Sequence, residues 1–141
     1  MAERWTILII LIILSAVDLR WQMLPSWMIL AAAAGGFCCT SATGWGKAEW
    51  ILWMVTSVGV LIICRLTRQS LGYGDGMMWS VTALYLGMEK NTEVWITAFF
   101  LACSFSVVAL LARKVRGDTR VPFLPFLTAA HGILLFLERG R

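Results

Sequence analysis

The sequence predicts an all-α fold, a polytopic membrane bundle of about six transmembrane helices. The chain has 141 residues, of which 60% are hydrophobic and 14% are charged, whereas a soluble domain carries about 25% charged residues. The hydrophobic residues form long blocks instead of single amphipathic stripes. Because a spanning helix needs about 20 mostly apolar residues, we interpret the blocks as membrane spans within a single domain, residues 1–141.

Six apolar blocks are candidate spans, joined by short connections that favour antiparallel neighbours. Their approximate boundaries are 5–23, 25–44, 48–65, 76–89, 93–112 and 121–137. The first block has the length of a signal-peptide core, but the segment "DLRWQMLP" after it offers no small-residue cleavage site. We therefore expect this block to be a retained first span.

The distribution of basic residues predicts the orientation. The connections after the first, third and fifth spans carry seven basic residues: Arg20, Arg65, Arg68, Arg113, Lys114, Arg116 and Arg120. The opposite side, which would hold both termini, carries five: Arg4, Lys47, Lys90, Arg139 and Arg141. The positive-inside rule places the first side in the cytoplasm. It also accounts for the net charge of +4 without a nucleic-acid partner, so we expect the bilayer as a partner and no nucleic acid.

The cysteines and the single histidine do not predict a metal site. The four cysteines, Cys38, Cys39, Cys64 and Cys103, lie inside apolar blocks and form no Cys-x-x-Cys pair. We interpret them as small buried hydrophobic residues. The only histidine, His131, also lies in an apolar block, where it is either a hydrogen-bonded residue of the bundle or a proton relay. We expect no metal and no cofactor.

Two aspartates are the candidate catalytic residues. Asp18 interrupts the first apolar block, and Asp75 lies in "LGYGDG", just before the fourth. Ionisable groups bordering a span are functional candidates because they are costly there. In the predicted topology both lie at the cytoplasmic face. Structural alternatives remain open, since Asp18 could pair with Arg20 or cap a helix, and Asp75 could cap the fourth helix.

The glycines around Asp75 predict an accessible site. Gly72, Gly74 and Gly76 should keep this segment from forming a stable helix. Their bare backbone groups would need a watery cavity or a pairing peptide strand near the bilayer. If Asp18 and Asp75 converge, they would share one proton. The ionised carboxylate would take a proton from an attacking water, and the protonated one would hydrogen-bond the peptide carbonyl.

Three segments resemble the type IV prepilin peptidases, which belong to the Gly-x-Gly-Asp membrane aspartyl proteases. "GYGDG" is similar to the family motif and corresponds to Gly72, Gly74 and Asp75. "DLRWQMLP" resembles the end of the first core helix, with Asp18 and Pro25 in the matching places. "VPFLPFLTAA" resembles the segment that opens the last helix, with Pro122, Phe123 and Pro125.

The resemblance implies an aspartic-type endopeptidase of the bacterial inner membrane. Such enzymes cleave the leader of type IV prepilins or pseudopilins at the cytoplasmic face, for pili, type II protein secretion and DNA uptake. It implies that Asp18 and Asp75 are catalytic and that the glycines and prolines named above, with Phe123, shape the substrate-binding loops. Many members carry a methyltransferase insert with paired Cys-x-x-Cys motifs; this sequence shows none, so we expect no methyltransferase activity.

Two departures from the family pattern leave an alternative open. The family usually has lysine two residues after the motif aspartate, where this chain has Met77, and Asn or Asp where it has Ser26. A non-catalytic relative, or an assembly or scaffold subunit of a pilus or type II secretion system, therefore remains the second hypothesis. A small proton-coupled transporter is a more distant third.

Overall fold

The protein is a bundle of helices in the computed structural model, which describes residues 2–21, 25–67, 72–112 and 122–139. These residues form six α-helices and no strand. The helices are α1 (Ala2–Trp21), α2 (Ser26–Thr43), α3 (Lys47–Leu66), α4 (Tyr73–Leu86), α5 (Met88–Leu111) and α6 (Leu124–Arg139). The all-α prediction is confirmed for the described part of the chain.

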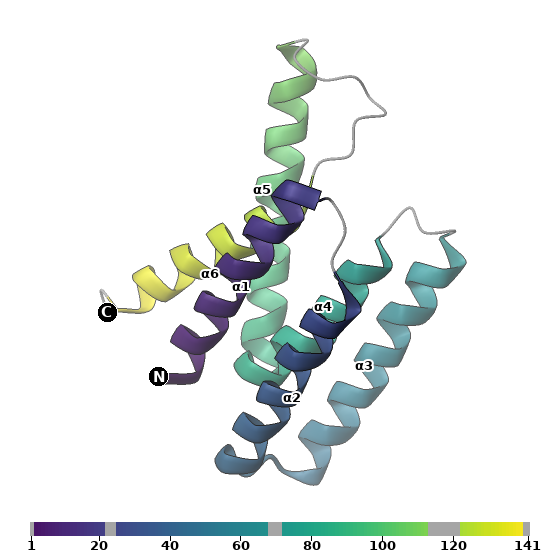
Figure 1. The fold of residues 1–141 in the computed structure, drawn as a ribbon, viewed down its shortest axis with the longest axis vertical. Coiled ribbons are helices and arrows are strands. Elements are labelled where there is room, and N and C mark those ends of the chain that lie inside the picture. The colour runs from purple at the N-terminus through teal and green to yellow at the C-terminus, as the bar shows by residue number, and fades with distance from the viewer. Residues whose placement is uncertain (1, 22–24, 68–71, 113–121, 140–141) are drawn as a thin grey trace.

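Helix α4 lies at the centre of the bundle (Figure 1). It packs against α2 and α3 on one side and against α5 and α1 on the other, while α6 packs between α1 and α5. The C-terminal ends of α1, α3 and α5 lie toward the upper part of the view, where α4 begins, and the chain turns from α2 into α3 at the lower end. The end of α1 and the start of α4 are thus on the same side of the bundle.

Side-chain hydrogen bonds fasten α4 to α2 and α3. The buried Tyr85 hydroxyl donates to the carbonyl oxygen of Ala32 on α2, at 2.8 Å. The indole N–H of Trp53 on α3 donates to the carbonyl oxygen of Ser80, at 2.9 Å. Each bond gives a partner to a polar group that would otherwise lack one in an apolar interior.

A buried polar network joins α4 to α5. Thr82 and Asn91 are both 0% exposed, and the Thr82 hydroxyl lies 2.6 Å from the Asn91 amide oxygen, to which it donates. The indole N–H of Trp95 donates to the same hydroxyl at 3.1 Å. Because an unpaired polar group is costly in an apolar core, this network fixes the register of the two helices.

Two glycines let α2 approach α4 closely. A Cβ on Gly36 would lie 2.8 Å from the Cβ of Leu84, and a Cβ on Gly35 would lie 2.5 Å from the Tyr85 hydroxyl oxygen. Both distances are shorter than real carbon contacts allow. The small-residue contact typical of membrane helices therefore joins α2 to α4.

The outside of the bundle is strongly apolar. Exposed large apolar side chains include Ile51, Val55, Ile62 and Leu66 on α3 and Phe100, Val108 and Leu111 on α5. Among the described helices, α3 and α5 are the two that are long and apolar enough to cross a membrane. The prediction of six spans is thus supported for these two helices by length and composition.

The other four helices do not meet that length and composition. Helix α4 has 14 residues, or about 21 Å of helix, against about 30 Å of hydrocarbon. The apolar parts of α2 and α6 are Ser26–Ser41 and Leu124–Glu138, and α1 carries charged residues near both ends. Because α4 is covered by its neighbours, it does not need to be long enough to cross the hydrocarbon layer.

One local prediction is wrong. The glycines were expected to keep the segment around Asp75 from being helical, but α4 begins at Tyr73, so Gly74, Asp75 and Gly76 all lie in its first turn. Packing on α3, described below, overrides the low helix propensity of glycine.

The α2–α4 contact yields a test of the packing. We expect Gly36→Ala to lower the free energy of unfolding by about 1–3 kcal/mol, because its Cβ would collide with backbone-anchored atoms of Leu84. Gly59→Ala is the matched control: its Cβ would meet nothing within 4 Å, and alanine favours a helix by about 1 kcal/mol. Thermal unfolding in detergent measures both variants. Equal melting temperatures for the two would contradict the close packing.

Candidate active site

Asp18 lies near the end of α1 and is almost buried. Its surface is 9% exposed, three residues before the helix ends at Trp21. The backbone N–H of Leu124, the first residue of α6, is a hydrogen-bond donor to its carboxylate. Among the described residues no ion pair involves Asp18, and Arg20 lies over the Trp21 ring at 5.8 Å. Pairing with Arg20 therefore finds no support here.

Asp75 lies in the first turn of α4 and is half-buried. The backbone N–H groups of Asp75 and Gly76 both donate to the carbonyl oxygen of Gly72, at 3.0 and 3.3 Å. Gly72 is the N-cap residue, and no side chain makes a cap hydrogen bond there, so Asp75 does not occupy the N-cap position. A Cβ on Gly72 would lie 3.0 Å from Oδ2 of Asp75. The carboxylate thus lies close over the backbone of Gly72.

The two carboxylates are electrostatically coupled. Asp75 lies just before the predicted span 76–89. It is not part of α3 or α5, the two described helices that are long and apolar enough to cross a membrane. Burial, and secondly the negative charge of Asp18, raise the pKa of Asp75 from 3.8 to about 6. Two carboxylates that interact strongly titrate as a coupled pair. The chain can therefore supply both a base and an acid from two aspartates 57 positions apart in the sequence (75 − 18).

The proline and phenylalanine residues singled out in the sequence lie at helix starts. Pro25 is the N-cap of α2, and its carbonyl oxygen accepts the N–H of Met28 at 3.0 Å. Phe123 precedes α6, and its ring centroid lies 5.2 Å from that of Trp95 and 4.9 Å from that of Phe99, both on α5. This aromatic contact holds the start of α6 in place, and with it the Leu124 N–H that faces Asp18.

Pro122 and Pro125 flank this contact. Both are half-buried, and Pro125 is the second residue of α6, where its missing N–H leaves no helical bond unmade. The substrate-binding role of these residues stays a prediction.

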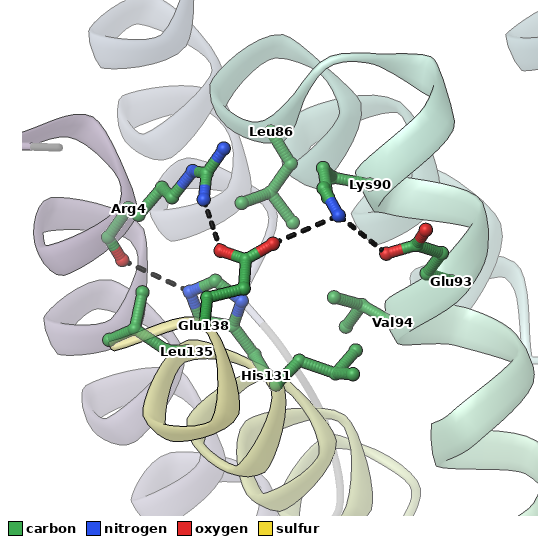
Figure 2. A pocket seen from close by; sticks show the side chains of 9 residues that line it. Arg4, Leu86, Lys90, Glu93, Val94, His131, Leu135 and Glu138 are labelled. Atoms are coloured by element: carbon green, nitrogen blue, oxygen red, sulfur yellow. Dashed lines mark hydrogen bonds and ion pairs between the residues drawn. The ribbon is translucent and has the colours of Figure 1, made fainter. Parts of the chain in front are cut away.

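A second polar cluster lies at the other end of α1 (Figure 2). Glu138 on α6 pairs with Arg4 on α1 and, at 2.9 Å, with Lys90 on α5. Lys90 also pairs with Glu93 at 2.9 Å, and these side chains with His131 line a cavity of about 10 Å³, the size of one water. Arg4 lies 14 residues before Asp18 (18 − 4), which is about 21 Å along the helix.

His131 belongs to this cluster. It is 3% exposed, and its Nε2 lies 3.0 Å from the carbonyl oxygen of Arg4. A carbonyl only accepts, so Nε2 carries the proton. The interpretation of His131 as a hydrogen-bonded residue of the bundle is confirmed, and its partner lies far from the two aspartates.

The cysteines are less uniform than predicted. Cys64 is buried, but Cys38 and Cys103 are exposed on the outside of the bundle and Cys39 is intermediate. Within the described ranges no three His, Cys, Asp or Glu side chains are grouped so that they could hold a metal ion. Cys64 also lies against Gly76, the residue after Asp75. No sequence pattern links these two positions.

The fold and the two coupled carboxylates define an all-helical protein with a candidate two-aspartate site. The chain matches the type IV leader peptidase family over residues 5–112 and belongs to that family. It is 25% identical over 138 residues to the prepilin leader peptidase/N-methyltransferases of Burkholderia pseudomallei strains 1026b and K96243.

The alignment covers 89% of this chain and 43% of each relative, so the chain spans less than half the length of those curated relatives. No solved structure matches the chain. The family match includes both aspartates but ends before α6.

The raised pKa of Asp75 predicts a pH-dependent cost to stability. The folded state binds this proton more tightly than the unfolded chain, so the stability contributed by the group is present below pH 4 and is lost as pH rises through about 6. Asp75→Asn should therefore be more stable than the unmodified chain at pH 7, by on the order of 1–3 kcal/mol, and equally stable near pH 4.

Thermal unfolding in detergent between pH 4 and pH 8 measures this difference. Glu89→Gln, at an exposed acid in the first turn of α5, is the control and should show no such gain. A less stable Asp75→Asn at pH 7 would mean that the carboxylate stabilises the helix start instead.

Proposed function

We propose that this chain is a membrane aspartyl endopeptidase that cleaves the leader of type IV prepilins or pseudopilins. The single observation that supports it best is the electrostatic coupling of Asp18 and Asp75 at one end of the bundle. Membership of the type IV leader peptidase family supports the same reaction class. In this proposal residues 1–141 form one peptidase core of the bacterial inner membrane, with no cofactor, no methyltransferase activity and no nucleic-acid partner.

The proposed mechanism uses one shared proton. We assign Asp18 as the base because its negative charge is one of the two causes that raise the pKa of Asp75, and because the Leu124 N–H is a hydrogen-bond donor to its carboxylate. Asp18 takes a proton from water as the water oxygen bonds to the peptide carbonyl carbon. Asp75, whose pKa is raised, donates its proton to the carbonyl oxygen, which gives a gem-diol. As the gem-diol collapses and its C–N bond breaks, Asp18 gives the proton it took from water to the leaving nitrogen, and the Asp75 carboxylate takes back a proton from a gem-diol hydroxyl.

The glycines and helix starts are proposed to hold the substrate. Gly72 is exposed at the start of α4, next to the Asp75 carboxylate. An extended peptide could lie along this start, where Gly72 and Gly74 offer a surface free of side chains. Gly76, which the sequence also placed in the substrate loop, is buried against Cys64, so we leave it out of the proposed substrate surface. We place Pro25 at the same side of the bundle, since α2 begins there (Figure 1).

The alternative function, a non-catalytic assembly or scaffold subunit, is supported by one residue position. Met77 stands where the family usually has lysine, and it is partly buried against the hydrophobic core. A non-catalytic relative serving as an assembly or scaffold subunit would need no polar group there. The two coupled carboxylates have no role in that alternative, so the peptidase is the function we favour.

The aspartate pair supplies the decisive test. We expect Asp18→Asn and Asp75→Asn each to lower kcat/KM for a prepilin-like precursor by roughly 1,000-fold or more, because amides cannot share the proton. The double variant should be no worse than either single one, since the two act as one unit. Precursor and product bands from membranes carrying each variant measure the cleavage.

Glu89→Gln is again the control and should leave cleavage unchanged. Mature product accumulating with Asp75→Asn would refute the assignment and favour the scaffold hypothesis. Retention in the membrane fraction shows that each variant is inserted, and thermal unfolding in detergent shows whether it is folded.

The proposed topology has its own test. A reporter inserted within 113–120 should be cytoplasmic, and one fused after Arg141 should be on the opposite side. The seven basic residues on the first side and the alternation of helix ends in Figure 1 support this orientation. Alkaline phosphatase and green fluorescent protein fusions give opposite signals at the two places. The reverse pattern would move Asp18 and Asp75 away from the cytoplasmic face.

A further inference from the structure

Helix α3 touches α4 at the residue that follows Asp75. A Cβ on Gly76 would lie 2.8 Å from the sulfur of Cys64, 3.4 Å from Leu61 and 3.7 Å from Val60. Cys64 is 1% exposed, and Gly76 is buried as well. The Cys64 sulfur therefore fills the space that any side chain at position 76 would need.

This contact controls the position of Asp75 because the first turn of α4 moves as one piece. Adjacent Cα atoms are about 3.8 Å apart, and the N–H groups of Asp75 and Gly76 share the carbonyl of Gly72 as acceptor. The Asp75 carboxylate in turn lies close to Gly72. A displacement of Gly76 by α3 would thus shift Asp75 relative to Asp18.

We propose that Cys64 is a positioning residue for Asp75: through its contact with Gly76 it sets how closely the first turn of α4 approaches α3, and so where the Asp75 carboxylate lies relative to Asp18. The inference rests on the proposed peptidase function for its activity readout. A displacement of about 1 Å lowers the rate of a preorganised site by about 100-fold, so a methyl group at position 76 is a sensitive probe.

The size of the residue at position 64 is what matters in this proposal. A thiol is small and tolerates an apolar setting without a partner. Alanine at position 64 removes the sulfur and leaves room for one methyl group from position 76. Larger residues would push the start of α4 outward.

The test is a pair of compensating substitutions. We expect Gly76→Ala to lower kcat for precursor cleavage by about 100-fold with KM within a few-fold, and Cys64→Ala alone to lower kcat by less than about 10-fold. The double variant should recover at least about 10-fold over Gly76→Ala, because the new methyl group occupies the place of the sulfur. Cys103, exposed on α5, gives the matched control: Cys103→Ala should not rescue Gly76→Ala.

The pH profile of kcat/KM separates positioning from general destabilisation. Among the described residues, Asp18 on α1 is the titratable group that acts on Asp75, and the Asp75 charge acts in turn on the Cys64 thiol on α3. A changed separation of the two carboxylates changes the strength of their interaction, so both limbs of the profile should shift in Gly76→Ala, and the double variant should restore them. Full activity of Gly76→Ala, or rescue by Cys103→Ala as readily as by Cys64→Ala, would overturn the inference.

Failure of the proposed function gives a different result. If the unmodified chain cleaves no precursor, the peptidase proposal fails, and the pH dependence of thermal stability becomes the readout. The stability gained by Asp75→Asn depends on pH, and the pH at which half of this gain appears is its midpoint. This midpoint should shift in the Gly76→Ala background. It should return to the original value when Cys64→Ala is added. An unchanged midpoint in all backgrounds would refute the positioning role.

Discussion

The burial of α4 among four other helices is the constraint on which the rest of the structure depends. Its five consecutive residues 81–85 are all buried, so no face of the helix is left to the surroundings. In a bilayer, where the lipid is as apolar as the side chains, such a helix is held by close packing and hydrogen bonds and not by the exclusion of water. The contacts through Tyr85, Ser80 and Thr82 supply that hold from α2, α3 and α5 in turn.

This arrangement explains how a carboxylate can be kept in an unfavourable place. Burial and the nearby Asp18 charge both disfavour an ionised Asp75, a cost that falls on the stability of the fold. A movement of α4 away from Asp18 would lower this cost. The close glycine contacts of α2 and α3 with α4 oppose such a movement. The first turn of α4 therefore holds Asp75 because it packs on its neighbours. The backbone hydrogen bonds of α4 connect this turn rigidly to the rest of the helix.

The sequence predicted the helical class and the approximate helix positions because apolar blocks of this length have few alternatives. It also predicted that Asp18 and Asp75 share one side of the bundle, which follows from counting antiparallel helices. The start of α4 was missed because glycine propensity is a local quantity, whereas Gly76 is helical through its tertiary contact with Cys64. That contact joins positions 12 apart (76 − 64) on two different helices, and no periodicity within either helix encodes it.

The two aspartates are held by different parts of the bundle. Asp18 is fixed by α1 and α6, through the Leu124 N–H at one end and the ion pair of Arg4 with Glu138 at the other. Asp75 is fixed by α4 and its neighbours. The packing of α1 against α4 joins the two helices that carry the aspartates. The separation of the carboxylates is therefore a property of the whole bundle, and substitutions at buried positions far from either aspartate can change it without touching the charged groups themselves.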